Sequence, residues 1–242
     1  MSRTFYHSGD LGDIVYSLPT IRNAGGGKLH LYNHPGRTSH GMSEFQFKSI
    51  EPLLSVQPYI EEAKLVPYPV SDCYLNGFRD HIRGGKNLAD AHACTFGYDW
   101  TIREKRWLSL PEHCKYSLLQ FPVIIAKTQR YPNHRFPWAR IIEKYKGKIG
   151  YIGFASEHEW FCNTFGPVQF IDAPNALSMA VLVAQSKLYI GNFTLATAIA
   201  EGLKHPSIVE VCPECASLST HVRLNCALGF DEKIELPDLE DL

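Results

Sequence analysis

The sequence predicts an α/β protein whose parallel strands form two separate halves. Short apolar segments alternate with helical segments over nearly all of the 242 residues, which is typical of parallel βαβ layers. The strand-like segments of the second half are rich in Ile and Val, as expected for strands that are covered on both faces. Prolines interrupt the alternation near residues 108–121, so we expect halves at 1–115 and 116–242 with a cleft between them.

Apolar periodicity and breaker residues place the elements in order. Strands are expected at 4–7, 29–33, 62–66, 123–127, 149–152, 168–171, 188–190 and 208–211. Helices are expected at 13–22, 43–54, 75–91, 137–145, 157–162, 176–184 and 195–203. The acidic last dozen residues are expected to form a solvated tail.

Composition and charge narrow the class of protein. The formal net charge of -1 and a pI near 6.8 argue against binding of nucleic acid by bulk charge alone. No apolar run approaches the roughly 18 residues of a membrane span, and the N-terminus lacks the layout of a secretory signal. We therefore expect a soluble, cytoplasmic protein.

The seven cysteines are an odd number in a chain too large to need disulfide bonds, so we expect reduced thiols. Their spacing raises one alternative, a structural zinc site formed by Cys212, Cys215, His221 and Cys226. The simpler interpretation is a loop after a strand, with the cysteines packed as small apolar groups.

The stretch Gly9-Asp-Leu-Gly-Asp-Ile-Val-Tyr-Ser-Leu-Pro-Thr-Ile-Arg22 directly follows the first strand. A tight loop containing Gly9 and Gly12 leads into a helix, with Asp13 where the N-cap belongs. Backbone N–H groups at such a helix start attract phosphate or another anion. Asp13 therefore either caps the helix or faces a ligand cleft as a base.

The stretch 188–203 repeats this arrangement in the second half. Gly191 allows a tight turn after the strand, and Asn192 or Thr194 caps a helix of small residues. Asn192, Thr194 and Thr197 then offer neutral donors near the helix start, which suits a pyrophosphate without a metal. An ordinary capped helix packed on the sheet would give the same pattern.

Two further loops follow predicted strands, at the edge where open α/β sheets bind ligands. In the loop 128–138, Arg130 and Arg135 are candidates for phosphate binding. Arg130 is a better candidate than the basic residues of the helix that follows, because it belongs to the loop. Four further basic residues of 127–148 are expected to form the solvated face of a helix: Arg140, Lys144, Lys146 and Lys148. Glu157 follows the next strand and is either a ribose ligand or a first-turn Glu favoured by the helix dipole.

The two glycine motifs together resemble the heptosyltransferase-type family of glycosyltransferases (glycosyltransferase family 9). The resemblance implies the GT-B architecture of two facing Rossmann-like domains. It also implies transfer of a sugar from a nucleotide-sugar, with inversion and without a catalytic metal or another cofactor. The chain is shorter than a usual member, like the compact versions encoded by phages and surface-polysaccharide clusters, so the acceptor is expected to be a glycan or a hydroxymethylated base in DNA.

The resemblance also implies roles for individual residues. Asp13 would be the general base that takes the proton of the acceptor hydroxyl. The remaining positions would bind the donor, with Glu157 at its ribose: Gly9, Gly12, Thr128, Arg130, Glu157, Asn192, Thr194 and Thr197. His34 and His40 lie in a loop that could close over the acceptor or form a surface connection.

The second motif departs from the family signature Asp-Thr/Ser-Gly-x-x-His. The corresponding positions are Asn192, Phe193, Thr194 and Thr197. This change leaves donor binding plausible but puts the identity of the sugar in doubt. It also favours the first alternative, a nucleotide-binding or nucleotide-sugar-binding protein without transfer. A second alternative, a DNA-binding protein, would require the seven basic residues of the segment 127–148 to face the cleft.

Overall fold

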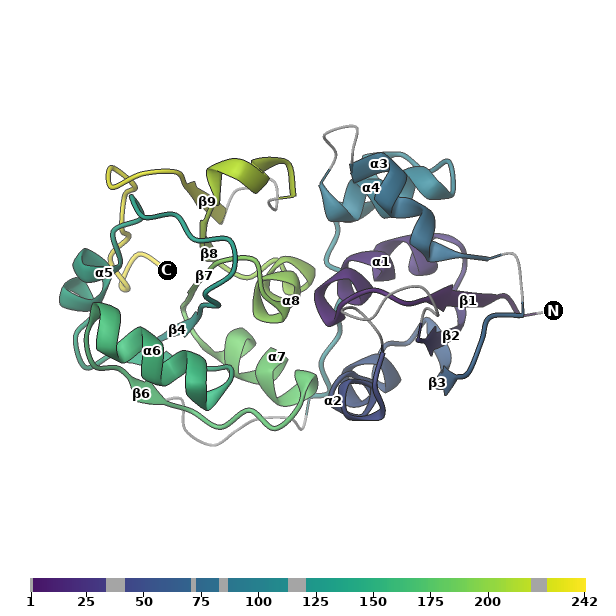
Figure 1. Ribbon diagram of the computed structural model, residues 1–242, viewed down its shortest axis with the longest axis horizontal. Helices are drawn as coiled ribbons and strands as arrows, with labels where there is room; N and C mark the ends of the chain where they lie inside the picture. The colour runs from purple at the N-terminus through teal and green to yellow at the C-terminus, as the bar shows by residue number, and fades with distance from the viewer. Residues whose placement is uncertain (1, 34–41, 71–72, 83–86, 113–120, 219–225) are drawn as a thin grey trace.

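The computed structural model describes residues 2–33, 42–70, 73–82, 87–112, 121–218 and 226–242, and these contain two parallel sheets (Figure 1). The first has the order β1-β2-β3, with bounds Thr4–His7, Gly27–Tyr32 and Ile60–Val66. The second has the order β6-β5-β4-β7-β8-β9. Its strands are β4 Val123–Ala126, β5 Ile149–Tyr151, β6 Gln169–Phe170, β7 Leu188–Gly191, β8 Ser207–Glu210 and β9 Cys226–Gly229.

The order of the second sheet is the doubly wound order, which reverses between β4 and β7. Ligands of open α/β sheets bind outside the carboxyl ends of the strands at such a reversal. The segments that begin at Lys127 and Asn192 leave β4 and β7 at this point. The fold therefore brings two of the predicted ligand-binding segments together.

Helices lie against both sheets, and some helices of each half meet those of the other half in the middle of the molecule (Figure 1). The N-terminal half contains α1 Leu11–Asn23, α2 Glu44–Ser55, α3 Phe78–Ile82 and α4 Leu88–Thr95. The C-terminal half contains α5 Trp138–Lys144, α6 Ala155–Phe165, α7 Ala176–Gln185 and α8 Leu195–Leu203. Short 3-10 turns lie at Leu75–Gly77, Trp100–Arg103 and Pro213–Leu218. Among the described residues, no helix combines the length and the hydropathy that a membrane crossing requires.

The two halves share one hydrophobic core, since α1 packs against α8 and α2 against α7. The segment before the second sheet also joins α8, because Trp107 and Leu108 donate backbone hydrogen bonds to the Gly202 carbonyl. A Cβ atom on Gly202 would lie 2.7 Å from the Leu108 side chain, so only glycine allows this approach. The expected boundary at 115/116 falls between the sheets, but outside the described residues, and it stays a prediction.

The α/β class and most elements agree with the sequence analysis, and β1 and α8 have the predicted bounds. Four details were wrong. Helix α1 begins at Leu11 with Asp10 as its N-cap, so Asp13 lies in the first turn instead. The described part of 75–91 is a 3-10 turn followed by α3 and the start of α4, and β9 was not predicted. The C-terminal segment is not a solvated tail, because Ile234, Leu236 and Leu239 pack against a separate hydrophobic core of the second half, which includes Trp138 and Phe161.

Candidate active site

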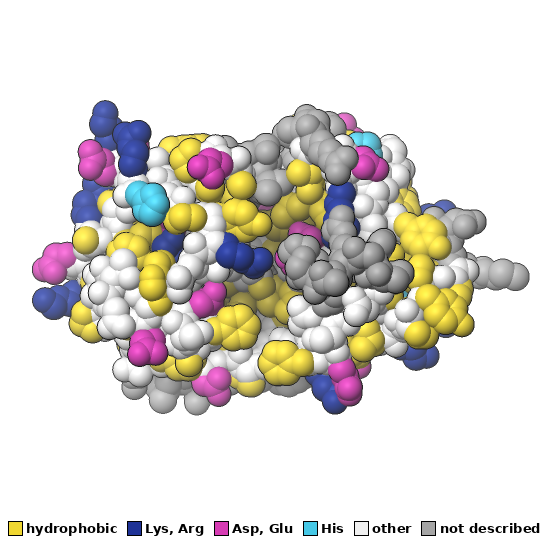
Figure 2. All heavy atoms as spheres, viewed as in Figure 1, with side chains coloured by type: hydrophobic (Ala, Val, Ile, Leu, Met, Phe, Trp, Pro, Cys, Tyr) yellow, Lys and Arg dark blue, Asp and Glu magenta, His cyan; other side chains and the backbone are white. Residues whose placement is uncertain are grey.

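Two adjoining pockets lie between the halves, and Figure 2 shows the hollow that they form, with hydrophobic side chains along it and charged groups at its edge. The Asp13 pocket has a volume of about 270 Å³, and the Glu157 pocket has a volume of about 680 Å³. Both are lined by Asp10, Gly12, Arg130, Thr194 and Leu195. The first motif and the turn after β7 therefore meet in one cleft, as the sequence predicts.

Asp13 lies in the first turn of α1 and lines the smaller pocket. The backbone N–H of Asp10 donates a hydrogen bond to Asp13 Oδ2 at 3.3 Å, which holds one carboxylate oxygen. Gly9 packs closely against the Asp13 side chain, since a Cβ atom at Gly9 would lie 2.8 Å from Asp13 Oδ2. Gly9 lines neither pocket, so it supports Asp13, whereas Gly12 lines both pockets.

A buried histidine pair under this loop was missed by the sequence analysis. His7 is fully buried, and its Nδ1 accepts the Gly9 N–H at 2.8 Å, which places the proton of a neutral ring on Nε2. The His92 ring lies 5.2 Å from the His7 ring and stacks on Phe78 at 4.1 Å. Burial lowers the pKa of His92 to about 3 and that of His7 well below its usual value. Both rings are therefore neutral at pH 7.

His92 makes no hydrogen bond of normal geometry with a described residue, although the carbonyls of Asp13 and Leu75 lie close enough to raise its pKa slightly. No sequence signal marked either histidine, because a single His on a strand or helix is usually part of the core.

Thr194 is the N-cap of α8 and accepts the Thr197 N–H at 3.3 Å, as predicted for one of the two candidate caps. It lines both pockets. Thr197 is buried, donates to the Asn192 carbonyl and bonds the Tyr189 hydroxyl at 2.8 Å. It lines only the Asp13 pocket.

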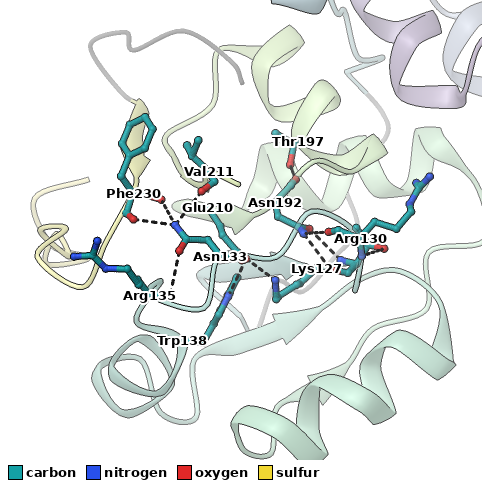
Figure 3. Close-up of polar contacts among 12 residues, drawn as sticks. Lys127, Arg130, Asn133, Arg135, Trp138, Asn192, Thr197, Glu210, Val211 and Phe230 are labelled. Atoms are coloured by element: carbon teal, nitrogen blue, oxygen red, sulfur yellow. Dashed lines mark hydrogen bonds and ion pairs between the residues drawn. The ribbon is translucent and has the colours of Figure 1, made fainter. Parts of the chain in front are cut away.

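Asn192 is fully buried and lines neither pocket, because its side chain binds the loop after β4 (Figure 3). Its Oδ1 accepts the Thr128 N–H at 3.0 Å, and its Nδ2 donates to the carbonyls of Thr128 and Arg130 at 3.0 and 2.9 Å. The residue therefore fixes the two strand ends together, and its polar groups are used within the protein.

A buried ion pair holds the other end of the same loop (Figure 3). Lys127 Nζ lies 2.6 Å from Glu210 Oε2, and the backbone N–H of Asn133 and the indole of Trp138 also donate to Glu210, at 2.6 and 3.0 Å. Burial lowers the pKa of Lys127, while Glu210 opposes this shift. Because Glu210 binds both Lys127 and the backbone of Asn133, it fixes the two residues that flank the loop 128–132.

Arg130 extends from this loop toward the N-terminal half (Figure 3). Its guanidinium is 3.9 Å from Asp10 Oδ2, and both side chains are partly exposed. Tyr131 follows with φ of 55°, an unusual conformation for a non-glycine residue, and its ring packs edge-on against Phe193 at 5.8 Å. Thr128 lines the Glu157 pocket only, whereas Arg130 lines both the Glu157 pocket and the Asp13 pocket.

Glu157 lies in the first turn of α6, as one of the two sequence interpretations has it, and it lines the larger pocket. Its role as a ribose ligand stays a prediction. A Cβ on Gly153 would lie 3.5 Å from Glu157 Oε2, so the carboxylate lies over the turn after β5. That turn needs glycine because its φ is 140°.

Several predicted residues lie elsewhere. His34, His40 and His221 fall outside the described residues. In the described part of the chain, no three or more His, Cys, Asp or Glu residues are grouped to hold a metal; Cys212 and Cys226 are buried. Arg140 and Lys144 bind carbonyls of the C-terminal segment at Glu232 and Leu236 and do not form a purely solvated face.

Neither protein-family models nor the sequences of curated proteins match this chain. Solved structures do. E. coli heptosyltransferase WaaC with ADP has a TM-score of 0.53 at 12% identity, over 93% of this chain and 92% of WaaC. The chain has the fold of a heptosyltransferase. E. coli ADP-heptose LPS heptosyltransferase II gives 0.51 at 12% identity, over 96% and 92% of the two chains.

A third structure is TibC of enterotoxigenic E. coli, described as a dodecameric iron-containing heptosyltransferase in complex with ADP-D-β-D-heptose. It matches with a TM-score of 0.54 at 10% identity, over 90% of this chain and 60% of TibC. These similarities confirm the α/β, GT-B-like fold class and, at the level of the fold, the resemblance carried by the two glycine motifs.

Proposed function

We propose that this protein is a glycosyltransferase that moves a sugar from a nucleotide-sugar to an acceptor hydroxyl, with inversion and without a catalytic metal. The observation that carries this proposal is the meeting of Asp13 with Thr194 and Arg130 in one cleft, at the strand-order reversal of a heptosyltransferase-like fold. The described structures of WaaC and TibC hold ADP and ADP-heptose, which supports a nucleotide-sugar as the donor.

Each group at the cleft has a part in direct displacement at the anomeric carbon. The Asp13 carboxylate accepts the proton of the acceptor hydroxyl as its oxygen bonds to that carbon. The bond from the carbon to the donor phosphate breaks, and its electron pair leaves with the nucleoside diphosphate. The N-terminus of α8 and the Arg130 guanidinium stabilise the developing negative charge.

The two substrates bind in different pockets. We assign the Glu157 pocket to the donor, with Thr128 and Arg130 near its phosphates and Glu157 near its ribose. The Asp13 pocket takes the acceptor, a surface glycan or a hydroxymethylated base in DNA. Asn192 contributes to donor binding only through the loop that it holds.

A nucleotide-binding protein without transfer is the second candidate, because Asn192 and Thr197 replace the acid and the histidine of the family signature. DNA binding through the segment 127–148 has less support, since Arg130 is the one basic residue of that segment that lines the Asp13 pocket, and Lys127 is buried in an ion pair.

Incubation with ADP-, GDP- and UDP-sugars, with and without candidate acceptors, tests the proposal. A transferase releases the nucleoside diphosphate much faster when its acceptor is present. Binding without release in any combination would favour the second candidate. Affinity for DNA that is lost with added salt, without nucleotide binding, would favour the third interpretation.

A further inference from the structure

Two phenylalanine side chains that line the larger pocket are mostly exposed to solvent and are not packed in the core. Phe45 is 75% exposed and Phe154 is 65% exposed, and both line the Glu157 pocket. Phe45 lies in the first turn of α2 in the N-terminal half, whereas Phe154 lies between β5 and α6 in the C-terminal half. An exposed aromatic ring in a pocket is informative because it can be buried by a ligand.

The position of Phe154 also costs helix stability. It is the N-cap of α6, and no side-chain hydrogen bond caps this helix. Ser, Thr, Asp or Asn at this position would satisfy a free N–H group, which an aromatic ring cannot do. Capping of α6 therefore does not account for a phenylalanine at this position.

The surroundings of Phe154 match one part of a nucleotide. Glu157, assigned above to the ribose, lies one turn further along α6, and its carboxylate lies over Gly153, the residue before Phe154. Thr128 and Arg130, assigned to the phosphates, line the same pocket. A volume of about 680 Å³ is in the range that holds a ligand of nucleotide size.

We propose that Phe154 and Phe45 bind the nucleobase of the donor by stacking, from opposite halves of the cleft. The inference rests on the proposed function and names the part of the donor that these rings recognise. Stacking on an aromatic ring accepts any base, because every base has a π-face. The carboxylate of Asp172, which lines the same pocket, is then left to discriminate between bases.

Calorimetric titration of the whole protein tests this. ADP, GDP and UDP are compared with inorganic pyrophosphate, which lacks a base. The main variant is Phe154→Ser, because serine removes the ring and improves the cap of α6, so it does not weaken the fold. Phe45→Ala is the second variant. Phe230→Ala is the control, since Phe230 is also 50% exposed but lines neither pocket of the cleft.

We expect Phe154→Ser to weaken binding of the preferred nucleoside diphosphate about tenfold or more. Phe45→Ala should weaken it severalfold, and pyrophosphate affinity should stay unchanged in both variants. Phe154→Trp should restore nucleotide affinity. Wild-type affinity for nucleotides in Phe154→Ser, or an equal loss for pyrophosphate, would overturn this inference while leaving the proposed function intact. If the wild type binds no nucleotide, both this inference and the proposed function are wrong.

Discussion

The guanidinium of Arg130 lies 3.9 Å from the Asp10 carboxylate, across the cleft between the two halves. Both residues line both pockets, and their side chains are 61% and 42% exposed. A pair this exposed contributes little to stability. We therefore expect the guanidinium of Arg130, and not the pair as such, to act on the phosphates of the proposed donor.

We expect Arg130→Gln to lower the turnover of the transferase at least tenfold, because the leaving diphosphate loses a cationic partner. The melting temperature should change little. Steady-state rates at saturating donor and thermal unfolding curves measure the two effects.

The matched control is Arg135→Gln, on the same loop. Arg135 is 74% exposed and lies 4.0 Å from Asp231, away from both pockets. Equal losses in the two variants would show that the loop, and not the charge of Arg130, is responsible.

Asn192→Asp should destabilise the protein, although the related family has an acid at this position. The carboxylate would face the carbonyls of Thr128 and Arg130 without a proton to donate. We expect the free energy of unfolding to fall by about 2–4 kcal/mol, since two buried carbonyls lose their donor. Urea unfolding measures the change.

Asn175→Asp provides the comparison. Asn175 caps α7 by accepting the Ser178 N–H at 2.9 Å, and Asp can accept the same bond. A neutral result there and a large loss at Asn192 are expected. If Asn192→Asp unfolds at the wild-type urea concentration, the described network is wrong.

The fold and the meeting of the two glycine motifs could be predicted because both depend on local patterns. Alternating segments indicate parallel strands, and loops at their carboxyl ends meet at one edge. The use of Asn192 within the protein could not be predicted, because its partners are 62 and 64 residues away in the chain. The packing of Ile234 and Leu236 was missed for the same reason, since the many acids around them suggested a solvated tail.

The buried histidine pair predicts a loss of stability in acid. Because burial lowers the folded-state pKa of His92 to about 3, and that of His7 as well, the native protein keeps both rings neutral. The unfolded chain binds protons below about pH 6.5. The contribution of the pair to stability is therefore greatest above this pH and falls as pH decreases toward 4, by about 1.4 kcal/mol per pH unit for His92, with His7 acting in the same direction.

Urea unfolding of the wild type and of His92→Phe from pH 7 to pH 4 tests this. Phenylalanine keeps the stacking on Phe78 but cannot bind a proton, so the dependence on pH should become shallower. His134→Gln, at an exposed position, should not alter it. An unchanged slope in His92→Phe would remove His92 as the cause.

The most direct test of the account is the turnover of Asp13→Asn together with its affinity for the nucleotide-sugar that the wild type uses. The variant keeps the shape of the side chain but cannot accept a proton. We predict a fall in kcat of about a hundredfold or more, with a nearly unchanged dissociation constant for the donor. Turnover equal to that of the wild type would contradict the assignment of Asp13 as the base.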